Sequence, residues 1–222
     1  DRLSGYGIPV ESTKPPATVL GVSEMSPYQV ATRYQGLLNQ GYLTPLKAVR
    51  TVVDDSGREL SRRFFESSRF MMARAAVQVD HMMRVGAKIG TGSAFGQRYR
   101  ELLASKTGTT DYGRDAWFVG ADGRRLGVAW VGFDDNRKAG LIGSVAALPV
   151  IAGAIQFVQR SDRAKTLPEG LMYGWLNQSG QIVDQSCEGA EKRPLPIEFQ
   201  PAQAGFCGGG SLESSSGSWL DN

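Results

Sequence analysis

Six consecutive residues bring together side chains suited to holding an anion: Ser105-Lys106-Thr107-Gly108-Thr109-Thr110. Lys106 supplies a fixed positive charge, and the hydroxyls of Thr107 and Thr109 can donate hydrogen bonds to the same anion. Gly108 has no side chain, so a peptide can approach the backbone closely there. The residue types alone indicate a basic, hydroxyl-bearing strand edge, with an ordinary polar strand end and glycine turn as the alternative.

Histidine and cysteine, the usual ligands of a zinc site, are rare among the 222 residues. There is one histidine, His81, and there are two cysteines, Cys187 and Cys207, which speaks against a zinc site of the usual ligands. His81 falls on a predicted helix and has no cysteine or aspartate partner. We therefore expect an ordinary helix residue rather than a catalytic one. Asp115 precedes Trp117 on a predicted strand, where we expect a structural hydrogen bond.

The anion-binding residues end the first of three predicted strands. The helical period ends before Leu102, and the residues that follow predict strands over 102–109, 116–121 and 125–133. Asp122-Gly123 is a hairpin signal between the last two, so the three strands form an antiparallel meander. An apolar helix predicted over 144–159 is expected to pack on this sheet. The expected core residues of the meander are Trp117, Phe118, Trp130 and Phe133.

The preceding residues predict two helices and a hairpin. Ser26-Pro27 combines an N-cap with a proline at the first helical position, and the helix ends near Gly41. Strands over 48–54 and 58–65 are joined by the turn Asp55-Ser56-Gly57. A second helix is predicted from Ser67 or Ser68 to Gly86. Its expected apolar stripe is Met72, Ala76, Val79 and Met83.

Composition indicates a globular chain of ordinary size. The 24.0 kDa sequence is 41% hydrophobic and 21% charged, which excludes wholesale disorder. A balance of 25 basic against 22 acidic residues does not favour nucleic acid. The chain starts at Asp1 rather than Met, and we expect a processed product or a piece of a longer polypeptide. The predicted parts are a domain over 1–160, a turn-rich extension over 161–207 and a disordered Gly/Ser tail over 208–222.

Four segments, in order and spacing, resemble the transpeptidase domain of penicillin-binding proteins. Lys106 to Thr109 match its Lys-Thr-Gly-Thr motif. Leu20-Gly21 with residues 26–31 is similar to its "LG…(S/T)P.EVA" helix, Gly90-Thr91-Gly92 to its "GTG" loop, and residues 115–120 to its "D.WF.G" strand. The likeness covers about residues 1–160 and is strongest to bifunctional class A enzymes of the one-b type in Gram-negative bacteria.

This resemblance implies an α/β (α+β) fold, with an antiparallel sheet flanked by helices as in penicillin-binding proteins and β-lactamases. It implies a D,D-transpeptidase that cross-links peptidoglycan stem peptides without a metal or cofactor. The implied catalytic groups are Lys106 and the backbone N–H of Thr109, half of an oxyanion hole. The implied substrate-binding residues are Ser105, Thr107, Gly108, Thr109 and Thr110. β-Lactams enter such a site because they mimic the D-Ala-D-Ala end.

Two motifs of the family are missing from the sequence. Neither Ser-x-x-Lys, which carries the nucleophile, nor Ser-x-Asn occurs, and the nearest approach is Thr44-Pro45-Leu46-Lys47. We therefore expect an N-terminally truncated transpeptidase domain that is inactive alone, with residues 125–133 as an open strand edge. A carboxypeptidase or β-lactamase of the same fold, and a non-catalytic binding module, remain alternatives.

The resemblance also bears on the cysteines, the location and the partners. One-b enzymes carry a cysteine pair after the catalytic domain, which favours a disulfide between Cys187 and Cys207 over two free thiols. The implied location is the periplasmic face of the bacterial inner membrane, with a membrane anchor and a glycosyltransferase domain outside this chain. Implied partners are stem peptides, β-lactams, the rest of the transpeptidase domain, lipoprotein activators and divisome or elongasome proteins, but not nucleic acid.

Overall fold

The computed structural model describes residues 24–94, 104–155, 166–199 and 207. The chain divides into a first unit, Asp1–Thr166, and a second unit, Leu167–Asn222. Predictions that fall on residues 1–23, 95–103, 156–165, 200–206 and 208–222 lie outside the described residues. In the described residues, no helix has the length and apolar character needed to cross a membrane.

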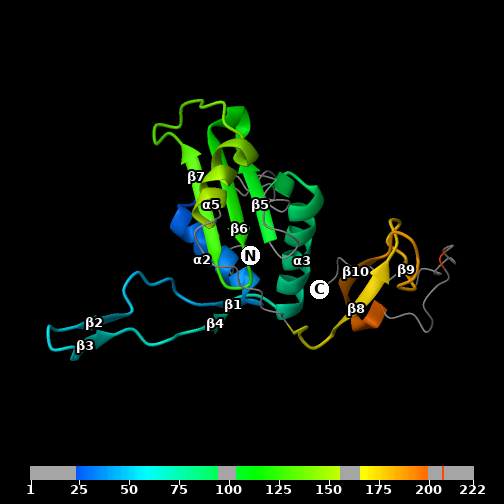
Figure 1. The fold of residues 1–222 in the computed structure, drawn as a ribbon, viewed down its shortest axis with the longest axis horizontal. Helices are drawn as coiled ribbons and strands as arrows, with labels where there is room; N and C mark the ends of the chain where they lie inside the picture. Colours follow the sequence, from blue (N-terminus) through cyan, green and yellow to red (C-terminus); the bar gives the residue numbers. More distant parts are fainter. Residues whose placement is uncertain (1–23, 95–103, 156–165, 200–206, 208–222) are drawn as a thin grey trace, which may run out of the picture. The chain divides into compact units, whose positions relative to one another are not determined.

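The predicted meander is confirmed in the first unit. Strands β5 (Ala104–Thr109), β6 (Asp115–Ala121) and β7 (Leu126–Gly132) are antiparallel and lie side by side in the order β5-β6-β7 (Figure 1). Within the described residues, β7 has a partner strand on one side only. The turn differs from the prediction by one residue: the Asp122 N–H donates to the carbonyl of Arg125, so Gly123 and Arg124 form it.

An apolar helical segment covers one face of this sheet, as predicted. It begins as the π-helix η3 (Gly143–Ala147) and continues as α5 (Leu148–Ile155). Phe118 is fully buried beneath it. Alternate strand residues share a face, so Ala116, which is also buried, lies beside Phe118. The buried core of this face is Ala116, Phe118, Ala129, Ala147, Leu148, Ile151 and Ala152.

The aromatic residues of the meander divide between core and surface. Trp117 and Trp130 are cross-strand partners with ring centroids 6.3 Å apart, and both are half-buried. The prediction that Phe133 belongs to the core is wrong. Its side chain is 41% exposed, because β7 ends at Gly132, and the Arg137 guanidinium stacks on its ring at 3.7 Å.

The first described helix, α2 (Pro27–Leu38), begins where the sequence predicted. The Ser26 hydroxyl accepts from the Gln29 N–H at 3.3 Å, and the Gln29 side chain accepts from the Ser26 N–H at 2.8 Å. This reciprocal capping box satisfies two donors that the helix itself leaves free. The helix ends just before Gly41, whose positive φ of 84° and close contact with the Met71 carbonyl exclude a side chain.

The second helix, α3 (Ala73–Ile89), begins later than predicted and runs along β5 (Figure 1). Ser67 and Ser68 do not cap it, because Ser68–Arg69 forms strand β4 and pairs with β1 (Tyr42–Leu43). The predicted stripe is also rotated: Met72 is 68% exposed and Val79 is only half-buried. The residues that α3 buries are Ala76, Asp80, Met83 and Ala87.

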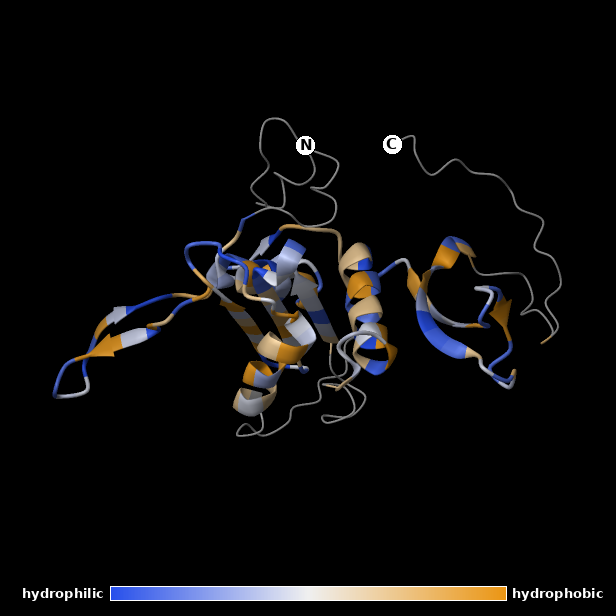
Figure 2. Ribbon diagram, turned by 90° about the horizontal axis from the view of Figure 1, so that it is seen from above, coloured by the Kyte–Doolittle hydropathy of each residue, from blue (hydrophilic) through white to orange (hydrophobic). Residues whose placement is uncertain are grey.

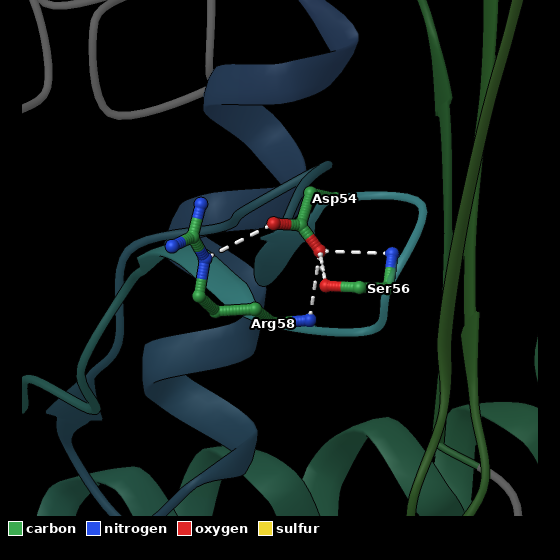
Figure 3. A network of polar contacts seen from close by, with 3 residues as sticks. All are labelled: Asp54, Ser56 and Arg58. Carbon is green, nitrogen blue, oxygen red and sulfur yellow. Dashed lines mark hydrogen bonds and ion pairs between the residues drawn. The ribbon is translucent and has the colours of Figure 1, made fainter.

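The predicted hairpin is present as β2 (Thr51–Val53) and β3 (Glu59–Arg62), and apolar residues on it are exposed (Figure 2). Its turn is organised by one carboxylate (Figure 3). Asp54 Oδ1 accepts from the N–H and hydroxyl of Ser56, at 3.0 and 2.6 Å, and from the N–H of Arg58 at 2.9 Å. The Arg58 guanidinium lies 3.0 Å from Oδ2. These hydrogen-bond donors lower the pKa of Asp54, and the Ser56 hydroxyl contributes most to the lowering.

The hairpin turn should therefore loosen in acid. Because the folded-state pKa of Asp54 lies below its unfolded value, its stabilising effect is complete above the ordinary carboxyl pKa of about 3.9 and is lost as the pH falls through the folded pKa. An NMR titration of the Asp54 carboxyl carbon should report a pKa below that ordinary value. Ser56→Ala removes the strongest donor and should raise the pKa of Asp54. An unchanged pKa in that variant would contradict the assignment.

The second unit contains a small sheet that the sequence did not predict. Strand β8 (Leu171–Leu176) pairs with β10 (Glu191–Pro196) on one side and β9 (Ile182–Val183) on the other. The polar, proline-containing sequence of β10 gives no strand signal, yet prolines are tolerated in a strand at a sheet edge. The sulfurs of Cys187 and Cys207 form a disulfide in this unit.

Candidate active site

The anion-binding residues occupy β5, at the edge of the described sheet. Ser105, Thr107 and Thr109 pair with Gly120, Phe118 and Ala116 of β6. Since strand side chains alternate, these three project to the same face as Phe118, whereas Lys106 and Gly108 project to the opposite face. The lysine and the threonines therefore cannot line one face of the sheet, and they can act together only at the outer edge of β5.

The backbone groups of β5 alternate in the same way between β6 and the outer edge. The Thr110 N–H donates to the carbonyl of Asp115 on β6 at 3.1 Å. In an antiparallel ladder, adjacent residues direct their N–H and C=O groups to opposite sides. The N–H of Thr109 and the C=O of Thr107 consequently point away from β6. The Thr109 donor thus faces the edge at which an oxyanion would have to lie.

The ammonium of Lys106 reaches this outer edge. Its side chain is exposed, and Nζ donates to the carbonyl oxygen of Thr107 at 2.6 Å. That carbonyl points outward, so the bond brings the positive charge around from the opposite face. The charge, the Thr109 N–H and the threonine hydroxyls converge along a few residues of one strand edge. This arrangement suits a carboxylate or a developing oxyanion.

The loop that follows α3 lies against the first half of β5. Thr91 Oγ1 is 2.6 Å from Thr107 Oγ1. The Ser105 hydroxyl lies close to Gly92, where an added Cβ would come within 2.3 Å of it. Ser105 is only 3% exposed, so its side chain is buried in the packing between strand and loop, and its expected role in substrate binding stays a prediction. Sequence reasoning identified this loop without assigning Thr91 to the site.

The second half of β5 is held by two further contacts. The Thr109 hydroxyl accepts from the Gly143 N–H at 3.1 Å, which leaves its own proton available. The Thr110 hydroxyl donates to the carboxylate of Asp115 and accepts from its N–H, both at 2.9 Å. Asp115 also accepts from the Trp130 indole at 2.9 Å, so its predicted structural role is confirmed. The Thr110 hydroxyl is therefore bonded within this turn, and its expected contact with substrate stays a prediction.

The remaining predicted site residues lie apart from this edge or make other contacts. Gly108 packs against its cross-strand neighbour, since an added Cβ would lie 3.1 Å from the Cβ of Trp117. His81 lies on α3, and the disulfide belongs to the second unit. The described residues contain no group of three or more His, Cys, Asp or Glu side chains placed to hold a metal ion. The candidate site is thus confined to the outer edge of β5 and the loop that follows α3.

Comparison with known sequences gives a family match over most of the first unit. The family described as "Penicillin binding protein transpeptidase domain" matches residues 6–141. Penicillin-binding protein 1B of Vibrio cholerae is 35% identical over 196 residues, which cover 87% of this chain and 25% of that protein. The chain therefore spans about a quarter of the length of the relatives that it matches.

Solved structures show the same fold. Penicillin-binding protein 1A from Haemophilus influenzae superimposes with a TM-score of 0.74 at 19% identity, over 91% of this chain and 36% of that one. PonA1 from Mycobacterium tuberculosis, in complex with penicillin V, gives a TM-score of 0.52 at 24% identity, over 74% of this chain and 50% of that one. The expected arrangement of an antiparallel sheet flanked by helices is confirmed.

Proposed function

Because the chain belongs to the transpeptidase domain family of penicillin-binding proteins, we propose that it forms part of a serine-type D,D-transpeptidase that cross-links peptidoglycan stem peptides. The observation that carries this proposal is the outer edge of β5, where the Lys106 ammonium, the Thr107 hydroxyl and the Thr109 N–H converge. A stem peptide ends in a carboxylate next to the scissile D-Ala-D-Ala bond. The ammonium and hydroxyl would hold that carboxylate, and the Thr109 N–H would stabilise the oxyanion on the neighbouring carbonyl.

The reaction divides into two acyl transfers. A serine hydroxyl attacks the penultimate D-Ala carbonyl, and the terminal D-Ala leaves as the amine after taking up a proton. An amine of a second stem peptide then attacks the ester, forms the cross-link and releases the serine. A β-lactam would follow the first step and stop at the acyl-enzyme. Penicillin bound to PonA1 is consistent with such a site in this family.

The serine would come from polypeptide outside these 222 residues. None of the serines here stands in Ser-x-x-Lys, and no Ser-x-Asn occurs. We accordingly propose that these residues complete a catalytic domain whose first two motifs lie upstream. The complete polypeptide would act at the periplasmic face of the inner membrane, where lipoprotein activators and division or elongation proteins would be its partners.

Labelling with fluorescent penicillin tests whether the nucleophilic serine lies outside these 222 residues. The folded 222-residue chain should acquire no covalent label, because the nucleophile is absent. The complete polypeptide encoded by the same gene should be labelled once, on a serine followed three residues later by lysine. With stem-peptide substrates it should form cross-linked dimers, whereas a carboxypeptidase would form only shortened monomers. Stable labelling of the 222-residue chain alone would contradict the proposal.

A further inference from the structure

We infer that Thr91 is a positioning residue for the anion site: its hydroxyl donates to Thr107 Oγ1 and directs the Thr107 proton toward the substrate carboxylate. The inference rests on the proposed function and adds a residue from a separate element to the site. Thr91 follows the C-terminus of α3, whereas Thr107 lies in β5. Their hydroxyl oxygens are 2.6 Å apart, which is a short hydrogen bond between two side chains.

The direction of this hydrogen bond decides what Thr107 can do. A threonine hydroxyl has one proton and can accept in addition. If Thr107 donated to Thr91, its only proton would be used inside the protein and only lone pairs would face a carboxylate. If Thr91 donates, Thr107 keeps its proton for the anion. A bound carboxylate accepts but cannot donate, so it selects this second arrangement, and the donated bond strengthens the next one.

The loop that carries Thr91 is held firmly enough to set this geometry. The Gly90 N–H closes the end of α3 on the carbonyl of Gly86 at 3.0 Å, and the Ser93 N–H bonds the carbonyl of Gly90 at 2.9 Å. Gly92 packs directly against the buried Ser105 hydroxyl, with no room for a side chain. Two successive loop residues thus contact two alternate residues of β5. Thr91 is consequently fixed relative to the strand rather than carried on a loose loop.

Paired variants of the complete polypeptide test the role. Thr91→Val keeps the shape and removes the hydroxyl, and it should lower the second-order rate constant of penicillin acylation about tenfold, the size of one polar contact. The loss should appear in the binding constant and not in the limiting acylation rate. Thr91→Ser should restore the rate. With the penicillin methyl ester, which lacks the carboxylate, Thr91→Val should change the rate less than twofold.

A double-mutant cycle distinguishes coupling between Thr91 and Thr107 from a general disturbance of the site. Thr107→Val should lower the rate at least as much as Thr91→Val, and Thr91→Val should have no further effect in the Thr107→Val background. Thr32→Val is the matched control, because the Thr32 hydroxyl bonds only the carbonyl of Tyr28 within α2 among the contacts described, and it should leave acylation unchanged. Equal losses for penicillin and its ester, or additive effects in the cycle, would overturn the inference.

The 222-residue chain provides a readout that needs no activity. NMR side-chain couplings of Thr107 should report one fixed χ1 rotamer in the original chain and in Thr91→Ser, and averaged rotamers in Thr91→Val. If the complete polypeptide is labelled by penicillin but Thr107 stays fixed and acylation is unchanged in Thr91→Val, the inference fails and the proposed function stands. If no penicillin labels the complete polypeptide, the proposed function fails, and the role of Thr91 toward a substrate fails with it.

Discussion

Gly143→Ala should lower the free energy of unfolding of the first unit by about 3 kcal/mol, the upper range for overpacking a tight contact. A Cβ at this position would lie 2.5 Å from the carbonyl oxygens of both Gly108 and Trp117. These oxygens belong to backbone paired between β5 and β6, so they cannot move without disturbing the ladder. The helical segment would instead be pushed off the sheet, and the hydrogen bond from Gly143 to Thr109 would be lost.

Gly153→Ala is the matched control for this prediction. Gly153 lies in α5, ten residues after Gly143 in the same helical segment, and a Cβ there meets nothing within 4 Å. Replacing a helical glycine by alanine should stabilise the unit by up to about 1 kcal/mol. Urea unfolding followed by the amide resonances of β5, β6 and β7 would measure both variants. Equal stabilities for the two would show that η3 does not sit on the backbone of β5 and β6 as described.

Lys106→Met should lower the rate of penicillin acylation of the complete polypeptide about 100-fold, which corresponds to about 2.7 kcal/mol. Methionine keeps most of the side-chain length and removes the charge that faces the substrate carboxylate. It also removes the hydrogen bond from Nζ to the outward carbonyl of Thr107, so the edge of β5 loses its cation and one fixed contact. The loss should be much larger for penicillin than for its uncharged methyl ester.

Lys88→Met provides the control for lost charge in general. Lys88 is an exposed lysine in the last turn of α3, and its replacement should leave acylation within twofold of the original rate. Stopped-flow measurement with a chromogenic penicillin would give both rate constants. A Lys106→Met variant that acylates as fast as Lys88→Met would remove the basis for placing the carboxylate at this strand edge.

Local sequence patterns predicted the central sheet well. The change of period after residue 102 placed all three strands of the meander, and Ser26-Pro27 placed the start of α2. These signals succeed because the side chains that define them are neighbours in sequence. They fail where a distant strand competes: Ser68 pairs with Leu43 instead of capping α3, and β10 forms only because β8 lies beside it.

The sequence alone determines the order of the motif residues and shows that the two nucleophile motifs are missing. The family resemblance also follows from the sequence, because it depends only on which residues occur and how they are spaced. Only the tertiary structure decides which of those residues can meet an anion. It buries Ser105, commits Thr110 to a turn, and joins Thr107 to Thr91 and Thr109 to Gly143, across 16 and 34 residues. Contacts at such separations depend on how a loop and a helix pack against β5, and no local periodicity encodes that packing.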